Sequence, residues 1–445
     1  MSYLDNILFA ILLIAGFGFF ASSVKKIIRN IKLGVNVDRK DNPKARWANM
    51  ALIALGQSKM VKRPVAGVLH IVVYVGFIII NIELLEIIID GLFGTHRIFA
   101  PYLGVVYDVL IASFEILAIL VIFAVTVFWI RRNGIRLKRF IHSDLKGFPK
   151  SDANYILYFE TVLMILFLLM NASDLHLQNV PGGFSHFHKA GTFPVSQFIA
   201  PMFNGMSNEL VMMLFEVFWW VHIAGILVFM NYLYFSKHLH ILLAFPNTYF
   251  ADLNPKGKFD NLESVTKEVK LMMDPNADPF AAAPVDENAA PSKFGASDVQ
   301  DLNWVQLLNA YTCTECGRCT SACPANQTGK KLSPRKIMMD TRDRLQEVGK
   351  NIDTNKGVFV PDSKTLLNDY ITPEELWACT SCNACVEECP VNISPLSIIM
   401  DMRRYLVMEQ SAAPMSLNAM MTNIENNGAP WQYSQQDRLN WKNEN

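Results

Sequence analysis

The sequence has no excess of charge of either sign, and several common signals are absent from it. Its 40 lysine and arginine residues balance 40 aspartate and glutamate residues, so nothing in the overall charge favours nucleic acid as a partner. No Cys-x-x-Cys-His segment occurs, which excludes the covalent attachment of a c-type haem. The first apolar run has no basic start and no small-residue cleavage site, so we expect a retained helix rather than a signal peptide.

Cysteine is absent outside two short segments, which hold all eight cysteines in the pattern Cys-x2-Cys-x2-Cys-x3-Cys-Pro. This pattern binds [4Fe–4S] clusters in bacterial two-cluster ferredoxins, in which the fourth cysteine of each run binds the other cluster. Structural zinc is the alternative, but zinc sites do not require two such runs ending in proline. The predicted ligand sets are Cys313, Cys316, Cys319 and Cys389 for one cluster, and Cys379, Cys382, Cys385 and Cys323 for the other.

Long apolar runs fill the first 243 residues. Hydrophobic residues make up 51% of the chain, and five runs approach or exceed the roughly 20 residues that a membrane-spanning helix needs. We therefore expect five transmembrane helices and contact with a lipid bilayer. The runs lie at 7–24, 65–89, 105–130, 154–171 and 210–236.

Lysine and arginine are concentrated in alternate loops between these runs. Residues 25–65 carry eleven and residues 131–150 carry seven, whereas 91–104 and 173–207 carry one each. Because loops rich in lysine and arginine stay in the cytoplasm, we expect the N-terminus outside and everything after the fifth helix inside. The expected location is a bacterial or archaeal cytoplasmic membrane. Its reducing cytoplasmic side argues against disulfides among the cysteines.

Histidines on the second and fifth apolar runs are candidate haem ligands. His70 lies near the cytoplasmic start of the second run, and His222 lies inside the fifth. His240 follows eighteen residues later, about five turns at 3.6 residues per turn, so the two are expected to share one helix face. Neutral imidazole is the usual axial ligand of a b-type haem. Passive packing is the alternative, although ionisable groups in a membrane are costly to bury.

Acidic residues also lie in the membrane half, and the deepest are Glu86, Glu115 and Glu216. A quinol that is oxidised releases two protons, and buried carboxylates can accept them. We predict these three as candidates for quinone contact or proton transfer, with a quiet, hydrogen-bonded position as the alternative. Histidines in loops, such as His96, are expected at the surface.

The remaining chain divides into a cytoplasmic linker, a cluster domain and a tail. An alanine- and proline-rich run at 281–291 has little capacity to bury a core. Ser-Pro and Thr-Pro pairs mark helix starts around the cysteine runs, and no alternating strand pattern appears there. The cluster domain is therefore predicted to be helical. The expected bounds are 1–243 for the membrane part, 244–300 for the linker, 301–408 for the cluster domain and 409–445 for the tail.

Two parts of the chain resemble known families. Residues 304–405, with CTECGRCTSACP, KLSPRKIMMDTRDRL and LWACTSCNACVEECP, resemble the cluster subunit of heterodisulfide reductase, and they are similar to helical domains of anaerobic glycerol-3-phosphate dehydrogenase and succinate dehydrogenase. Residues 50–242 resemble the cytochrome b subunit of respiratory nitrate reductase and the membrane subunit of heterodisulfide reductase. The implied fold class is all-α: a five-helix transmembrane cytochrome b bundle followed by an α-helical dicluster ferredoxin domain.

The membrane resemblance also implies cofactor ligands. It places one haem b between His70 and His240. In the nitrate reductase family a second histidine follows ten residues after the first, where this chain has Ile80, so His222 lacks its usual partner for a second haem.

The implied function is a membrane-bound electron-transfer subunit of a quinone-linked oxidoreductase complex. It would connect a quinone pool, haem b and two [4Fe–4S] clusters to a cytoplasmic redox subunit. The segment NNGAPWQYSQQDRLNW at 426–441 is similar to one that precedes the cysteine-rich catalytic domain of heterodisulfide reductase-like chains, which implies docking of a separate subunit of that type. The alternatives are a quinone reductase subunit linked to an electron-transfer flavoprotein or a dehydrogenase, and a redox-sensing or assembly scaffold.

Overall fold

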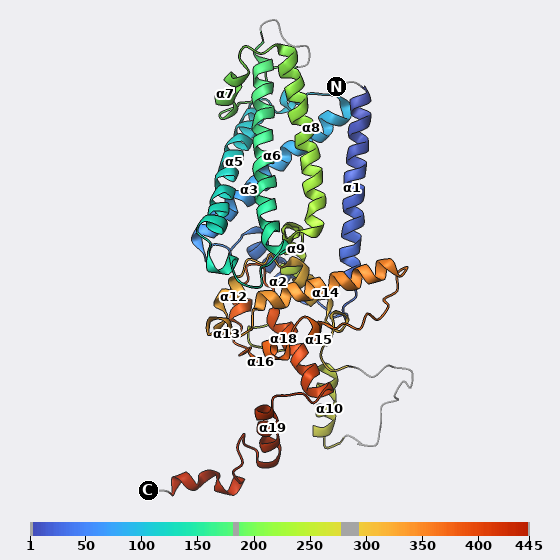
Figure 1. Ribbon diagram of the computed structural model, residues 1–445, viewed down its shortest axis with the longest axis vertical. Helices are drawn as coiled ribbons and strands as arrows, with labels where there is room; N and C mark the ends of the chain where they lie inside the picture. The colour runs from blue at the N-terminus through green and yellow to red at the C-terminus, as the bar shows by residue number, and fades with distance from the viewer. Residues whose placement is uncertain (1–2, 181–186, 277–292, 444–445) are drawn as a thin grey trace.

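The computed structural model describes residues 3–180, 187–276 and 293–443, and within them the chain is mainly helical (Figure 1). The strand-like pairs in these ranges are two isolated bridges, Val35 with Asn303 and Leu367 with Ile371. The all-α secondary structure expected from the sequence is therefore confirmed. Long helices form a bundle at one end of the molecule, and shorter helices form a second region below it (Figure 1).

Five helices of the described chain are long and apolar enough to cross a membrane, which confirms the five expected spans. Inward side chains such as Phe9, Ile111 and Ile223 are fully buried, whereas Phe123 and Val228 stay more than half exposed. An apolar outer surface of this kind suits a bundle surrounded by lipid. The helices are α1 (Tyr3–Ile31), α3 (Pro64–Phe93), α5 (Val105–Trp129), α6 (Phe148–Gln178) and α8 (Asn208–Tyr232).

The N-terminus and the second region lie at opposite ends of the bundle, as five crossings require (Figure 1). We call these the N-terminal end and the cluster end. At the N-terminal end, two short helices, α4 (Ala100–Leu103) and α7 (Ser196–Ile199), cover the loops. Arg97 is buried there and donates to Asp174 of α6 at 2.6 Å and to the Tyr107 hydroxyl at 3.0 Å. This buried cation therefore fixes the loop before α4 to two helices.

The fifth span ends close to its predicted bound, but its helix does not continue to His240. α8 stops at Tyr232, the backbone is extended at Ser236 (φ −105°, ψ 148°), and a separate helix, α9 (His240–Tyr249), follows. The prediction that His222 and His240 share one face of a single helix is therefore wrong.

A buried carboxylate on α6 causes this break. Asp152 is 1% exposed and accepts hydrogen bonds from the Tyr232 hydroxyl at 2.6 Å and from the backbone amide of Lys237 at 3.1 Å. Because the Lys237 amide donates to a side chain, it does not donate to the backbone carbonyl four residues earlier, as a continued α8 would require. α9 then packs against α2 (Pro43–Met50) and α11 (Trp304–Thr312), between the bundle and the second region.

The second region carries both cysteine runs in a set of short helices around one longer helix. Three helices begin where Ser-Pro or Thr-Pro predicted, because Ser333, Thr372 and Ser394 accept hydrogen bonds from backbone amides of the first turns. The helices after α11 are α12 (Arg318–Ala322), α13 (Pro324–Gln327), α14 (Pro334–Thr354), α15 (Leu366–Asp369), α16 (Pro373–Trp377), α17 (Ala384–Glu388) and α18 (Pro395–Arg404).

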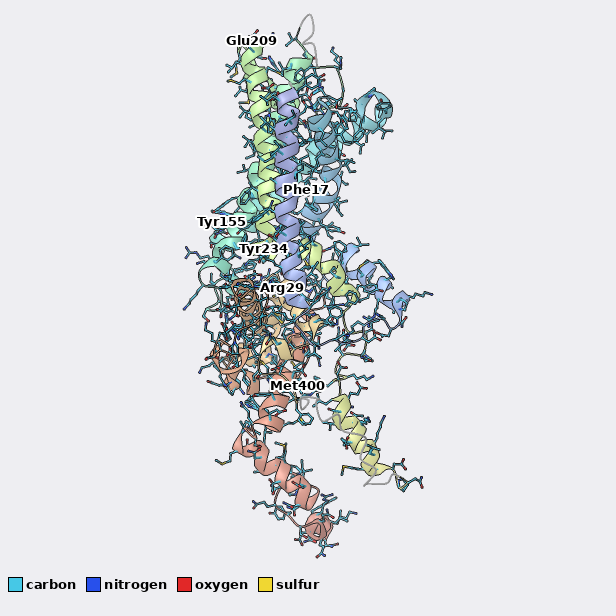
Figure 2. The ribbon with its side chains drawn as sticks, turned by 90° about the vertical axis from the view of Figure 1, so that its right-hand side faces the viewer. Phe17, Arg29, Tyr155, Glu209, Tyr234 and Met400 are labelled. Carbon is cyan, nitrogen blue, oxygen red and sulfur yellow. The ribbon has the colours of Figure 1, made fainter. Side chains whose placement is uncertain are left out.

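The cluster end of α1 rests directly on this region. Asn30 is 4% exposed, and its amide donates to the Tyr311 hydroxyl of α11 at 2.8 Å. A Cβ atom at Gly349 of α14 would lie 2.5 Å from the Asn30 side chain, so glycine permits this close approach. Figure 2 shows Arg29 at the same end of α1. The first membrane helix is thus part of the support for the cluster region.

The segment expected to be a linker, 244–300, contains folded parts. The alanine- and proline-rich run at 281–291 lies outside the described residues. Before it, α10 (Glu263–Met273) is exposed along its length. After it, Val299 and Leu302 are fully buried in the core of the cluster region, so the packed chain begins before the expected boundary at 301.

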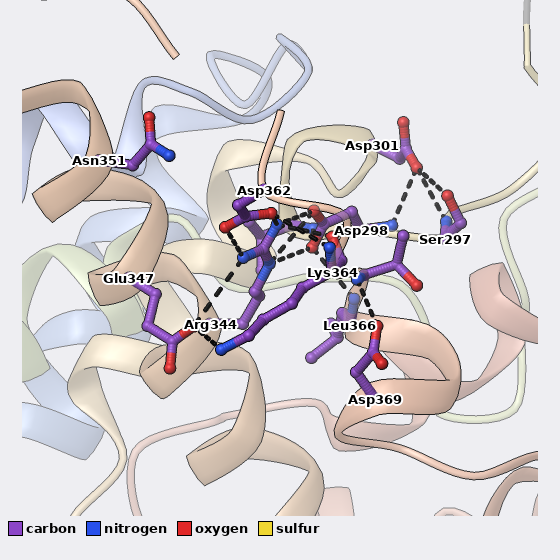
Figure 3. A network of polar contacts seen from close by, with 12 residues as sticks. Ser297, Asp298, Asp301, Arg344, Glu347, Asn351, Asp362, Lys364, Leu366 and Asp369 are labelled. Carbon is purple, nitrogen blue, oxygen red and sulfur yellow. Dashed lines mark hydrogen bonds and ion pairs between the residues drawn. The ribbon is translucent and has the colours of Figure 1, made fainter. Parts of the chain in front are cut away.

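A buried arginine attaches this stretch to α14 (Figure 3). The Arg344 side chain is fully buried between Asp298, at 2.8 Å, and Asp362, at 2.6 Å, and it also donates to the Lys364 carbonyl at 2.8 Å. Its fork of donors suits two carboxylates at once. Arg344 therefore joins three separate segments of the cluster region.

Replacing Arg344 with methionine should destabilise the cluster region by about 2–3 kcal/mol. Breaking a fully buried ion pair costs about 3–5 kcal/mol, and the value here is lower because both aspartates are partly exposed. Urea unfolding of the purified full-length protein measures the change. Arg438→Met, in the exposed tail, is the matched control and should leave the unfolding curve in place; equal curves for both variants would contradict the role of Arg344.

Candidate functional site

The two cysteine runs lie beside each other, because α12 and α17 pack together. Cys313, Cys316 and Cys319 come from the loop before α12 and from its first turn, and Cys389 follows α17. These four cysteines line one cavity, together with Arg318 and Arg335. The structure therefore brings together the first predicted ligand set, which we call the proximal set.

The second predicted set is also gathered in one place. Burial and, after it, the charges of Cys379, Cys323 and Cys382 together raise the pKa of the Cys385 thiol to about 12. The other three sulfurs of the set therefore lie within the range of charge interaction with Cys385. Cys382 is exposed, whereas Cys323 and Cys385 are buried. We call these four cysteines the remote set.

Both runs use the same backbone conformation to form their loops. Residues at matching positions have positive φ: Glu315 and Ser381 after the first cysteine, and Gly317 and Asn383 after the second. The left-handed conformation is energetically costly for residues other than glycine and asparagine. Its presence at Glu315 and Ser381 therefore indicates that the loop conformation serves a function. Backbone amides also approach sulfur, as at Ile393, whose amide lies 3.3 Å from a cysteine sulfur of the proximal set.

The cysteines are not gathered around one ion-sized site. Around zinc, four sulfurs each lie at about 2.3 Å from the ion and therefore close to one another. Among the described residues, no group of three or more histidine, cysteine, aspartate or glutamate side chains is arranged to hold one ion. The proximal set instead lines a cavity.

Loops from the cluster end of the bundle close the proximal cavity. The Lys59 ammonium donates to the Asn392 side chain at 2.9 Å, and the Arg318 guanidinium donates to the Lys59 carbonyl at 3.2 Å. Asp144, in the loop after α5, accepts from Ser333 at 2.6 Å and is paired with Arg335. The proximal set therefore faces the loops at the cluster end of the bundle.

A charged group inside the proximal loop adds to this attachment. Glu315 is 4% exposed and is paired with Lys237 of the chain between α8 and α9 and with Arg342 at 2.8 Å. Burial would raise the pKa of Glu315, but the charges of Lys237 and Arg342 outweigh it and hold that pKa below its ordinary value. The loop is thus tied to the membrane part by a carboxylate that remains ionised.

Three histidines gather where the bundle meets the proximal cavity. The ring centres of His70 and His240 are 6.3 Å apart, and those of His238 and His240 are 5.5 Å apart. His240 Nδ1 lies 3.1 Å from the Lys237 carbonyl, which leaves Nε2 available, and the buried Nδ1 of His70 has no hydrogen-bond partner in the described chain. Burial lowers the pKa of His238 to about 3 and also lowers that of His240, so both are neutral.

The distance between the His70 and His240 rings is compatible with a haem bound between them. An imidazole nitrogen binds a metal at about 2 Å, so the ring centres of two ligands on opposite faces of one iron lie roughly 6 Å apart. The observed 6.3 Å agrees with this value. The haem prediction on this pair therefore fits the described residues, and the break after α8 is what brings His240 to His70.

His222 is placed differently. It is 4% exposed inside the bundle core, and its Nδ1 has no hydrogen-bond partner in the described chain. The centre of its ring lies 6.1 Å from the centre of the Phe167 ring, and Ile80 packs in the same core. The structure does not bring a second histidine to His222 among the described residues.

The predicted acidic residues divide into two kinds. Glu86 accepts from the Phe99 amide at 2.9 Å and the Tyr107 hydroxyl at 2.8 Å, and fully buried Glu115 accepts from the amides of Val195 and Ser196 at 2.8 and 3.0 Å. Both therefore hold the chain segments of the N-terminal end in place. Glu216 instead lines a cleft at that end.

The same cleft contains His96, which was expected at the surface. Its side chain is 18% exposed, with Nε2 at 3.3 Å from Asp174 and its ring packed on Phe187 and Phe215. The prediction that His96 lies at the surface is therefore wrong, because the loop is attached to Asp174 of α6. Arg97, the single arginine of this loop, was the signal in the sequence that a buried carboxylate lies nearby. The cleft is lined by Asp90, Gly94, Thr95, His96, Phe187, Met212, Phe215, Glu216 and Trp219.

Comparisons with known proteins agree with the cluster assignment. Residues 312–393 match the family of 4Fe-4S dicluster domains. The probable iron-sulfur-binding oxidoreductase FadF of Bacillus subtilis is 30% identical over 460 residues, which cover 96% of this chain and 59% of that protein. The EtfAB:quinone oxidoreductase of Syntrophomonas wolfei is 25% identical, over 92% of this chain and 55% of that protein.

A third relative matches a shorter part of the chain. It is a subunit of the ferredoxin/F(420)H(2)-dependent CoB-CoM heterodisulfide reductase of Methanosarcina acetivorans, and it is 32% identical over 108 residues, which are 24% of this chain and 52% of that subunit. The chain thus spans less than two thirds of each of these relatives. No solved structure matches. The chain is therefore a relative of iron–sulfur oxidoreductases and carries a dicluster domain.

The exchanged fourth cysteines give a direct test of the two sets. If Cys389 belongs to the proximal set, Cys389→Ser should disturb the cluster held by the first run, and Cys323→Ser should disturb the cluster of the second. Each variant should retain about half of the non-haem iron, because the other set of four remains complete. Iron analysis and EPR of the reduced proteins measure this. Loss of the second run's cluster in Cys389→Ser and of the first run's cluster in Cys323→Ser would contradict the exchange.

Proposed function

We propose that this protein is the membrane subunit of a quinone-linked oxidoreductase, in which electrons pass between a membrane quinone and a soluble partner by way of haem b and two [4Fe–4S] clusters. The observation that carries the proposal is the His70 and His240 pair, whose rings lie 6.3 Å apart, together with the hydrogen bond from Arg318 of the proximal cavity to the loop just before the helix of His70. The names of the relatives that match nearly the whole chain support it.

The chain's own residues set the order of the cofactor sites. His70 and His240 would hold a haem at the cluster end of the bundle, the proximal set would hold the next cluster, and the remote set the last. When bound, these groups accept and release single electrons. The protein supplies fixed positions, buried surroundings and hydrogen bonds to sulfur, as expected of a scaffold for electron transfer.

The proposed orientation places the cluster region in the cytoplasm and the N-terminus outside. The two loops rich in lysine and arginine, within 25–65 and 131–150, both reach the cluster end, where Lys59 and Arg139 contact the cluster region. Lysine- and arginine-rich ends face the cytoplasm. We propose the same domain bounds as in the sequence analysis, except that the packed part of the cluster domain begins at residue 293.

The cleft at the N-terminal end is the proposed quinone site. A quinol that is oxidised there gives up two electrons and two protons, and Glu216 and His96 are the groups placed to accept the protons. Glu86 and Glu115 act by positioning the surrounding chain. Asp90 of the cleft and His70 lie on the same helix twenty residues apart, roughly 30 Å at 1.5 Å per residue.

His222 lies between these two levels of the bundle, and it is the residue on which we propose a second haem. Its buried, unpartnered Nδ1 supports this position, whereas its second axial ligand is not among the histidines that the structure brings to it. A haem held by His222 would therefore lie between the cleft and the His70 pair along the bundle.

The soluble partner is proposed to meet the remote set, where Cys382 is exposed. Beyond it, α19 (Met415–Asn427) extends away from the body of the protein and leaves Met415 and, farther on, Trp441 exposed (Figure 1). A cysteine-rich subunit of heterodisulfide reductase type is one candidate. An electron-transfer flavoprotein is the second, and it is favoured by the relative named EtfAB:quinone oxidoreductase, which matches 92% of the chain rather than a shorter part of it.

The haem assignment is tested by His70→Ala in the purified full-length protein. Removing one axial ligand should abolish the low-spin b-type absorbance, or lower it by at least tenfold, because one imidazole cannot hold the iron in that state. The same preparation should no longer transfer electrons from a soluble quinol to the clusters, which EPR follows directly.

His238→Ala is the matched control for this experiment. His238 lies 5.5 Å from His240 in the same neutral, buried group, yet its Nε2 approaches Glu160 at 3.8 Å rather than the His70 ring. The control should keep its haem spectrum. Unchanged haem in His70→Ala, or equal loss in both variants, would contradict the proposed ligand pair.

A further inference from the structure

Arg318 is a buried cation without a carboxylate partner. It is 4% exposed, and its guanidinium donates to the carbonyls of Lys59 at 3.2 Å and Met60 at 3.4 Å. No ion pair joins it to an acidic side chain in the described ranges. Two other buried arginines of the cluster region, Arg335 and Arg344, are each paired with aspartate. Arg318 therefore differs from its neighbours in having only neutral acceptors.

An unpaired buried charge is unfavourable, so its position indicates a missing anion. Arg318 lines the proximal cavity together with the proximal cysteine set, and two of those cysteines flank it in the sequence, at 316 and 319. Four thiolates around one iron–sulfur cluster supply negative charge at this place. The group that the cavity would hold is thus the natural counter-ion of Arg318.

Three other cations near this cavity have carboxylate partners: Arg335 is paired with Asp144, Lys237 with Glu315, and Arg63 with Glu388 at 2.9 Å. Arg139 has no ion pair among the described residues, but it is only half-buried and stacks on the Phe140 ring at 4.8 Å. Lys59 donates to the Asn392 side chain at 2.9 Å, and burial lowers its pKa to about 8. Arginine stays protonated in proteins. Arg318 is therefore the buried arginine at this cavity that has no carboxylate partner in the described chain.

Arg318 also connects the cluster loop to the helix of His70. The turn that it holds, at residues 59–60, packs on the first turn of α3, where a Cβ atom at Gly67 would lie 2.8 Å from the Met60 carbonyl oxygen. His70 follows one turn later on the same helix. The guanidinium thus lies between the cavity and the entry to the helix that carries the proposed haem ligand.

We propose that Arg318 is the fixed counter-charge of the proximal cluster, and that it raises the reduction potential of this cluster by stabilising the form that has gained one electron. The cluster's net charge and its hydrogen bonds are among the factors that set such potentials. This inference rests on the proposed function, because it takes the proximal cysteine set as the ligands. Arg318 acts here as a positioning and tuning residue and has no contact with substrate.

The test is a redox titration of the purified full-length protein, followed by EPR of the two reduced clusters. In Arg318→Gln, the ratio of reduced to oxidised proximal cluster at a fixed potential should fall about tenfold, which is a shift of about 59 mV to lower potential for one electron. Arg318→Lys keeps the charge and should shift the potential by much less. The remote cluster should titrate as in the unmodified protein.

Arg403 provides the matched control. It donates to the Leu376 carbonyl at 2.6 Å and to the Cys379 carbonyl, so it is the cation that accompanies the remote set. Arg403→Gln should lower the potential of the remote cluster and leave the proximal one unchanged. If Arg318→Gln shifts neither cluster, shifts both equally, or is matched by Arg318→Lys, the charge role of Arg318 is wrong.

A second variant covers the case in which Arg318→Gln fails to retain its cluster. Arg318→Met removes the same charge and replaces it with an apolar side chain that can fill the same buried space. It should lower the potential of the proximal cluster in the same direction, and an unchanged potential would overturn the proposal. Absence of [4Fe–4S] signals from the unmodified protein would instead overturn the proposed function, and this inference with it.

Discussion

The link between the membrane bundle and the proximal cysteine loop depends on one buried carboxylate, Asp152. By accepting hydrogen bonds from the Tyr232 hydroxyl and the Lys237 amide, it ends α8 and directs the chain into the space between the bundle and the cluster region. Two consequences follow from that change of direction. His240 reaches His70, and the Lys237 side chain reaches Glu315 inside the proximal cysteine loop. A continuous helix would have provided neither contact.

The basic loops have a second role that their charge count does not reveal. Lysine and arginine in loops at one membrane face are usually treated as markers of orientation. In this chain several of them are also structural: Arg29 donates to the Gly349 carbonyl at 3.0 Å, Arg63 pairs with Glu388, and the Arg139 carbonyl accepts from Arg335 at 2.7 Å. The same basic segments therefore hold the cluster region against the long helices of the bundle.

Much of this organisation could be predicted from the sequence, because its signals are local. The cysteine spacing predicted two groups of four with exchanged fourth members, and the members of the first group line one cavity, while the exchange itself stays a prediction. Five apolar runs and the Ser-Pro and Thr-Pro pairs marked the helices correctly. The break at Ser236 could not be predicted, since the residues after it are also apolar and the cause lies on another helix, at Asp152. The burial of His96 and the packing of Val299 and Leu302 likewise depend on residues distant in sequence.

The central claim is that the two cysteine sets hold [4Fe–4S] clusters in line with a haem. Quantitative iron, acid-labile sulfide, zinc and haem analysis of the purified full-length protein, together with EPR after reduction, tests it most directly. The account predicts about eight iron atoms per chain outside haem, matching sulfide, b-type haem, and signals from two interacting clusters. Zinc in place of iron, or iron without sulfide, would contradict it.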